Sequence, residues 1–158
     1  MLPQEILKSK ELKVMAITCD AFKHNTYIPV KYTCDGENIN PPFNIKNIPL
    51  EAKSLVLIIE DQDAPVRPWV HWIVWNIPLT EDIKENTVPG IEGWNDFGNQ
   101  NYGGPCPISG THKYLFKIYA LNQLIELNPA ATKTELEKAM NPYIIAFGEL
   151  VGLYKRIA

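Results

Sequence analysis

Acidic residues and histidines stand at the ends of apolar runs in this sequence, where their side chains could bind a small ligand. The stretch EDQDAPVRPWVHWIVWNIP (60–78) contains Asp61 and Asp63, followed by His71 at the start of an aromatic run. If residues 61–63 are extended, both carboxylates point to one side, about 7 Å apart. A carboxylate could then orient the ring of His71 and fix which nitrogen faces a ligand. The simpler alternative is a solvated turn beside a core histidine that is hydrogen-bonded to a backbone carbonyl.

A loop rich in glycine and proline, YGGPCPISGTHKY (102–114), forms the second candidate site. Gly103, Gly104 and Gly110 allow the backbone to approach a ligand closely, so successive N–H groups could form an anion-binding nest. His112 follows at the entrance to the next apolar run. Together the two segments suit a zwitterionic ligand, with a phosphate on the amides and imidazoles and a carboxylate facing the cationic end. Taken alone, the loop is equally compatible with an ordinary turn.

The cysteines allow an enzymatic alternative. Cys19, Cys34 and Cys106 are scattered, odd in number and without a CxxC pair, so we expect neither a disulfide framework nor a structural zinc site. Cys106 precedes His112 by six residues, and its thiol, with His112 and Asp61 nearby, could act as the nucleophile of a hydrolase-like enzyme. A packed, unreactive cysteine is the competing interpretation.

Metal-assisted hydrolysis is a further alternative, with Asp61, Asp63, His71 and His112 as ligands. The sequence contains no signature of the HExxH type to support it. Because no motif dictates a nucleophile either, we expect a ligand-binding protein rather than an enzyme, without a cofactor or a metal.

Composition and charge limit the class of protein. The 158 residues carry a net charge of −3 with no run of like charges, which argues against nucleic-acid binding. The start, MLPQEILKSKELKVMAI, lacks the apolar core of a secretion signal, and no stretch approaches the roughly 18 apolar residues of a membrane span. We therefore expect a single cytoplasmic domain (1–158), monomeric or homodimeric, with peripheral membrane contact at most.

Four apolar runs predict β-strands, namely KVMAIT (13–18), SLVLIIE (54–60), WVHWIVW (69–75) and YLFKIYAL (114–121). The second barely alternates, so we expect it to be buried on both faces. A helix is expected over TKTELEKAM (132–140), where Thr132 and Glu135 match a capping box. Residues 143–156 indicate a helical turn and then a strand from about Glu149. The fold class is mainly β, a sandwich of two sheets with one or two short helices near the C-terminus.

The aromatic strand places His71 in apolar surroundings. Strict alternation divides its residues between two faces, Trp69, His71, Ile73 and Trp75 on one and Val70, Trp72, Val74 and Asn76 on the other. Further along the chain, Trp94 and Phe97 could form a partner surface or pack over the wall of a pocket.

The motifs together resemble the phosphatidylethanolamine-binding protein family, in its bacterial and archaeal branch related to Raf kinase inhibitor protein. The stretches that carry the resemblance are YIPVKYTCDGENINPPF (27–43), EDQDAPVRPWVHWIVWNIP (60–78), GGPCPISGTHKYLFKIYAL (103–121) and FGELVGLYKR (147–156). The combination of DxDAP…HW with GP…GxH[RK]Y is more specific than either half.

This resemblance implies a β-sandwich with a small anion pocket at one end for phosphate-like groups or phospholipid headgroups. It also implies a regulator of a kinase or protease, and a cis peptide bond before Pro42. The implied ligand-binding residues are Asp61, Asp63, Trp69, His71, Gly104, Pro105, His112 and Tyr114.

The sequence departs from the family pattern at four positions, and these departures are expected to change ligand preference rather than fold. Gln62 replaces the usual proline between the acids, Ile108 a common proline, Lys113 the usual arginine and Asn40 a frequent serine. Lysine cannot form the bidentate contacts of arginine.

Overall fold

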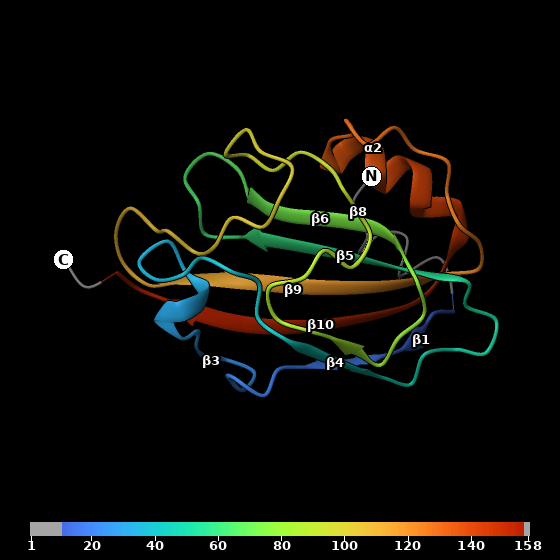
Figure 1. Ribbon diagram of the computed structural model, residues 1–158, viewed down its shortest axis with the longest axis horizontal. Coiled ribbons are helices and arrows are strands. Elements are labelled where there is room, and N and C mark those ends of the chain that lie inside the picture. The colour runs from blue at the N-terminus through green and yellow to red at the C-terminus, as the bar shows by residue number, and fades with distance from the viewer. Residues whose placement is uncertain (1–10, 157–158) are drawn as a thin grey trace.

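Two β-sheets form the body of the protein in a computed structural model that describes residues 11–156 (Figure 1). Residues 1–10, on which most of the expectation about a secretion signal rests, lie outside the described residues. The larger sheet contains β1 (Lys13–Val14), β3 (Thr26–Tyr27), β5 (Ser54–Asp61), β6 (Trp69–Ile77), β8 (Ile91–Glu92), β9 (His112–Leu121) and β10 (Ile144–Tyr154). The smaller sheet contains β2 (Ala16–Thr18), β4 (Phe43–Lys46) and β7 (Asp82–Ile83).

Helical structure in the described part of the chain is short. It consists of α2 (Lys133–Met140) and two 3₁₀ turns, η1 (Val30–Tyr32) and η2 (Asn141–Tyr143). The predicted capping box is confirmed, because the Thr132 hydroxyl accepts the Glu135 N–H while the Glu135 carboxylate accepts the Thr132 N–H. The predicted fold class, a mainly β sandwich with one or two short helices near the C-terminus, is also confirmed.

The central strand β5 explains why the larger sheet is covered on both faces. All eight of its residues are buried, as its nearly continuous apolar sequence predicts. Leu57 and Ile59 pack into the core between the two sheets. Val56 and Ile58 pack on the opposite face, in a second apolar cluster that includes residues of α2. The sandwich therefore has a third, helical layer.

Two strands differ from their predicted boundaries. β10 begins at Ile144, five residues before the predicted start, and the helical turn precedes it. The first half of this strand has apolar residues on both faces, including Ile145 and Phe147, so its sequence does not alternate between apolar and polar residues. KVMAIT is divided at Met15, since β1 pairs with β10 in one sheet and β2 with β4 in the other. A strand that changes sheets forms a corner of the sandwich.

The expected cis bond before Pro42 is wrong, because every described peptide bond is trans. The trans isomer is the preferred one even before proline. At this turn the Asn40 side chain donates hydrogen bonds to the carbonyls of Pro41 and Lys84, each at 3.1 Å.

Strand direction determines which sequence segments meet. β5 runs antiparallel to β6 and to β9, and its last residue, Asp61, lies beside Trp69 on one neighbour and Tyr114 on the other. The end of β5 therefore adjoins the beginnings of β6 and β9. The loops around these ends gather at the left of Figure 1.

Among the described residues, no helix is both long and apolar enough to cross a membrane.

Candidate ligand-binding pocket

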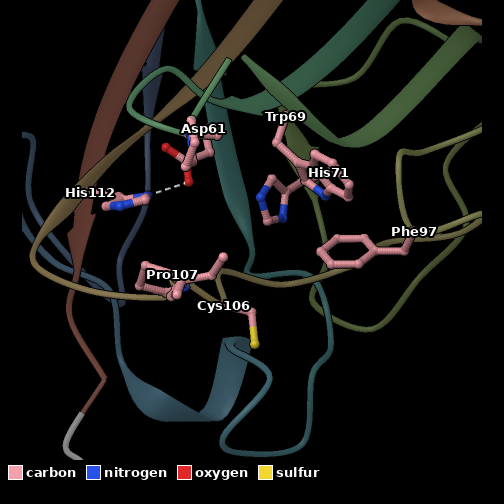
Figure 2. A pocket seen from close by; sticks show the side chains of 10 residues that line it. Asp61, Trp69, His71, Phe97, Cys106, Pro107 and His112 are labelled. Carbon is pink, nitrogen blue, oxygen red and sulfur yellow. Dashed lines mark hydrogen bonds and ion pairs between the residues drawn. The ribbon is translucent and has the colours of Figure 1, made fainter. Parts of the chain in front are cut away.

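A hollow of about 350 Å³ opens where β5 ends and where β6 and β9 begin (Figure 2). Its lining is mostly apolar and surrounds one carboxylate and two imidazoles. The residues that line it are Asp61, Ala64, Pro65, Trp69, His71, Phe97, Cys106, Pro107, Ile108 and His112.

Asp61 holds the ring of His112 rather than that of His71. The Asp61 carboxylate lies 2.6 Å from Nδ1 of His112, and both side chains are largely buried. It also accepts the N–H of Asp63 at 2.9 Å. The expectation that an acid of this motif orients His71 is therefore wrong, because the start of β9 brings His112 closer to Asp61. A carboxylate at Nδ1 fixes the ring and leaves Nε2 for another partner.

His71 is oriented by the glycine loop instead. Its Nδ1 lies 2.6 Å from the Gly103 carbonyl, and the Gly103 N–H donates to the His71 carbonyl at 3.0 Å. A carbonyl can only accept, so Nδ1 carries the proton and Nε2 is an acceptor in the neutral ring. Burial lowers the pKa of His71, although the contacts with Gly103 and the charge of Asp61 oppose this effect. The ring is thus held neutral.

A β-bulge places His71 at this position. The register pairs Ile59 with Trp72 but Glu60 with Val70, which leaves His71 as the extra residue of β6. The predicted division of β6 into two faces consequently fails at Val70, which packs in the cluster near α2 while Trp72 lies between the sheets. Bulges commonly redirect side chains beside functional sites.

The amides of the glycine loop do not form the expected nest. The Gly104 N–H donates to Oδ1 of Asn38 at 2.8 Å, and the Gly103 N–H donates to the backbone carbonyl of His71. A Cβ atom on Gly104 would lie 2.4 Å from the Tyr32 carbonyl oxygen. Glycine is therefore required there by close packing of two loops, not by the approach of a ligand.

Four of the eight predicted site residues line the hollow, and four do not. Asp61, Trp69, His71 and His112 line it, whereas Asp63, Gly104, Pro105 and Tyr114 are outside the lining. The Asp63 carboxylate accepts the N–H of Lys113 at 2.8 Å and so ties the loop to β9. Tyr114 is fully buried, and its ring meets that of His71 edge-on. Whether any of the eight binds a ligand stays a prediction.

The pocket also contains residues that sequence reasoning did not select. Phe97, expected either on a partner surface or over the wall of a pocket, packs edge-on against the ring of His71 with centroids 5.2 Å apart. Ala64 and Pro65 follow the acids, and Pro107 precedes His112 within the quoted motifs. These side chains are small or rigid and stand next to predicted polar residues in the sequence. That position was the signal that could have identified them as pocket residues.

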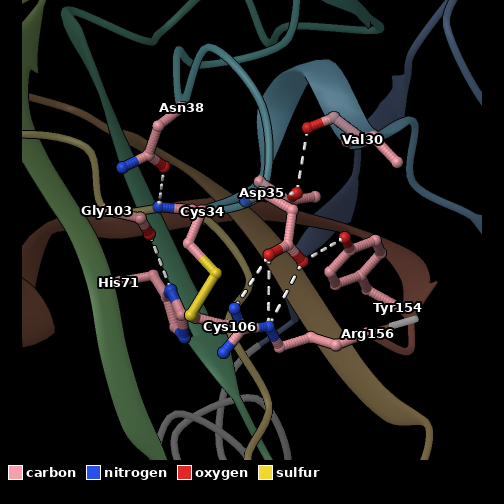
Figure 3. Close-up of a disulfide and its surroundings, with 11 residues drawn as sticks. Val30, Cys34, Asp35, Asn38, His71, Gly103, Cys106, Tyr154 and Arg156 are labelled. Carbon is pink, nitrogen blue, oxygen red and sulfur yellow. Dashed lines mark hydrogen bonds and ion pairs between the residues drawn. A yellow bond between two sulfur atoms is a disulfide. The ribbon is translucent and has the colours of Figure 1, made fainter. Parts of the chain in front are cut away.

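A disulfide joins Cys34 to Cys106, contrary to our expectation of no disulfide framework (Figure 3). The two cysteines are 72 residues apart in sequence, but the Cys34 N–H donates to the Pro105 carbonyl and brings the two loops together. Because its sulfur is bonded, Cys106 is not the free thiol that the hydrolase-like alternative requires. Cys19 is a free, buried cysteine.

Within residues 11–156, no group of three or more histidine, cysteine, aspartate or glutamate residues has the arrangement of a metal site. The side chains of Asp61 and His112 contact each other, and the Asp63 carboxylate accepts the backbone N–H of Lys113. The ligand set considered for metal-assisted hydrolysis is therefore not assembled.

Known proteins resemble this chain in sequence and in fold. The family profile described as phosphatidylethanolamine-binding protein matches residues 18–155. A UPF0098 protein of Pyrococcus abyssi is 48% identical over 153 residues, which span 90% of this chain and 86% of that protein.

Two solved structures share the fold. A phosphatidylethanolamine-binding protein homologue from Chlamydia trachomatis aligns with a TM-score of 0.87 and 39% identity, over 92% of this chain and 99% of that one. YbcL of E. coli, described as a member of the mammalian family, aligns with a TM-score of 0.84 and 26% identity, over 90% and 99%. The protein therefore belongs to the phosphatidylethanolamine-binding protein family.

Proposed function

We propose that this protein binds small molecules that carry a phosphate or similar anionic group, including phospholipid headgroups, in the pocket at the end of β5. The main support is the convergence of two imidazoles, His71 and His112, on one hollow of about 350 Å³. That volume suits a small ligand, because ligand pockets commonly measure about 300–1,000 Å³. The names of the related proteins make phosphoethanolamine a suitable first probe.

The protonation of His71 and of the ligand determines which anions this pocket favours. Neutral His71 presents Nε2 as an acceptor, which suits a protonated ligand oxygen such as that of a phosphate monoanion. The second pKa of a phosphate monoester is about 6, so the share of the monoanion rises as the pH falls. We therefore expect binding to strengthen as the pH falls from 8 toward 6.

The apolar part of the lining would contact the carbon atoms of the ligand. Trp69, Phe97 and Pro107 offer ring faces around the polar group. Such pockets bind through apolar contact and use a few polar groups for orientation. An organic phosphate should thus bind more tightly than inorganic phosphate.

Isothermal titration calorimetry with phosphoethanolamine and inorganic phosphate tests the proposal. His71→Ala should weaken phosphoethanolamine binding by about tenfold or more, because a buried hydrogen-bonding partner is lost. His24→Ala is the matched control, since His24 lies in another hollow of the surface, and it should bind as the wild type does. Absence of binding at millimolar ligand, or equal affinity in the His71 variant, would refute the proposal.

A further inference from the structure

The disulfide between Cys34 and Cys106 lies between two hollows of the surface. Cys106 and Phe97 line the proposed ligand pocket and also a neighbouring hollow of about 520 Å³, which Cys34 lines as well. Both cysteines are partly exposed. The disulfide thus lies beside solvent-filled hollows, and exposed disulfides are the ones that tend to be labile or regulatory.

On one side, the disulfide is attached to a firmly held loop. Asp35 accepts hydrogen bonds from the Tyr154 hydroxyl at 2.6 Å and from Arg156 at 2.9 Å, which tie this loop to the end of β10 (Figure 3). The Cys34 N–H also donates to the Pro105 carbonyl at 3.1 Å. None of these contacts uses a sulfur atom, so they remain available after reduction.

On the other side, the disulfide restrains a wall of the pocket. Residues 107–111 connect Cys106 to β9, and none of them hydrogen-bonds to another described residue. Pro107 and Ile108 nevertheless line the pocket; Pro107 is buried, whereas residues 108–111 are exposed. Beyond Pro107, the position of this wall therefore depends on the two ends of the segment, of which Cys106 is the one fixed by the disulfide.

The segment just before Cys106 is held independently of the disulfide. Gly103 exchanges hydrogen bonds with His71, and the Gly104 N–H is bonded to Asn38. Reduction would consequently free the wall without displacing the carbonyl that orients His71. The change is expected to be local, because the sheets are packed through other contacts.

We propose that this disulfide is a redox-sensitive latch, whose reduction by a dithiol frees residues 107–111 and weakens ligand binding in the pocket. The effect on affinity rests on the proposed function. A thiolate of the dithiol attacks the Cys106 sulfur, forms a mixed disulfide and releases Cys34 as a thiolate; the second thiol then displaces Cys106. The dithiol loses two electrons and becomes a disulfide, and the two cysteines take up the two protons.

The first test does not depend on a ligand. Backbone ¹⁵N order parameters are measured for a Cys19→Ser protein, which retains only the disulfide cysteines, before and after treatment with dithiothreitol. The order parameters of residues 108–111 should fall to about 0.6 or less on reduction, while those of β5 remain near about 0.85. Unchanged order parameters in residues 108–111 would overturn the latch.

The second test measures coupling to the pocket. The affinity for phosphoethanolamine should fall about tenfold on reduction, because a less ordered wall costs more to immobilise on binding. A variant with both Cys34→Ser and Cys106→Ser should match the reduced protein and be insensitive to dithiothreitol. Equal affinity in the two redox states would overturn the coupling. If the oxidised protein binds no ligand, the proposed function fails. The order parameters alone then show whether reduction frees residues 108–111.

Discussion

Two neighbouring acids at the end of β5 are equally buried but have different surroundings. Glu60 is 3% exposed and Asp61 is 4% exposed. Glu60 contacts the ammonium groups of Lys117 and Lys133, each at 2.5 Å, in the layer between β9 and α2. The ion pair that Asp61 makes within residues 11–156 is with His112, and Asp61 faces the pocket.

The difference separates a structural charge from one available for function. Burial opposes the ionisation of Glu60, but Lys117 and Lys133 together outweigh it and lower the pKa of this carboxyl. Its charge is thus fully compensated without a ligand. The partner of Asp61 is the imidazole of His112, and both side chains line the pocket. A ligand in the pocket can therefore contact the Asp61–His112 pair, whereas Glu60 is not part of the lining.

The largest expected effect comes from Glu60→Gln, which removes the carboxylate shared by two mostly buried lysines and leaves Lys133 with only the more distant Glu137, at 4.0 Å. The free energy of unfolding, measured by urea denaturation at pH 7, should fall by about 3 kcal/mol. Because the pKa of Glu60 is lowered, its stabilisation is present above about pH 4.3 and is lost as the pH falls further.

The control for this variant is Glu149→Gln, at an exposed position of β10. It should change stability by less than about 0.5 kcal/mol. Affinity for phosphoethanolamine should be unchanged in both variants. A Glu60 variant as stable as the wild type would remove the contrast between the two acids.

Asp61→Asn should have the opposite profile, with a larger effect on binding than on stability. The amide accepts a hydrogen bond more weakly than a carboxylate, so it holds the ring of His112 less firmly and His112 becomes a poorer anion ligand. We expect phosphoethanolamine affinity to fall about tenfold, and the free energy of unfolding by about 1–2 kcal/mol. Calorimetry of this variant beside Glu60→Gln shows which acid serves the pocket; equal affinities would contradict our assignment.

The pH dependence of stability should report the burial of His71. Its pKa is lowered in the folded state, so below about pH 6.5 the unfolded chain binds a proton that the folded protein does not. The free energy of unfolding should therefore decrease as the pH falls from 6.5, with a slope of at most about 1.4 kcal/mol per pH unit for this group. His71→Phe should flatten the curve in this range, and an unchanged slope would show that His71 titrates normally.

The smallest effect is expected for Asp63→Ala. This exposed residue accepts one backbone N–H, that of Lys113, and lies outside the pocket lining. Stability should fall by about 1 kcal/mol or less, and phosphoethanolamine affinity should stay within about twofold. A tenfold loss of affinity would show that Asp63 takes part in ligand binding, as the motif alone suggests.

Patterns that depend on local sequence allowed correct prediction of much of the fold. The unbroken apolar run of β5 indicated burial on both faces, and the spacing of Thr132 and Glu135 indicated the start of α2. The four motif segments indicated the family, and the antiparallel strand pairings bring three of them, 60–78, 103–121 and 147–156, to one edge of the sheet.

The errors at the candidate site concern contacts between segments that are distant in sequence. The bulge at His71 and the choice of His112 as the partner of Asp61 follow from strand register, which residue types do not specify. The disulfide follows from the meeting of two loops 72 residues apart. The spacing of residues in the sequence indicates neither the strand register nor the meeting of these loops. The amides of the glycine loop were assigned to a ligand for the same reason, because their actual acceptors are remote in sequence.

The most direct test of the account is a ¹⁵N NMR titration of the imidazole resonances with phosphoethanolamine. The ligand should shift the Nε2 resonances of His71 and His112 with a single saturating affinity, and His24 should not respond. If His71 and His112 remain unshifted at saturating ligand, or if His24 shifts equally, the convergence of the two imidazoles does not form an anion site.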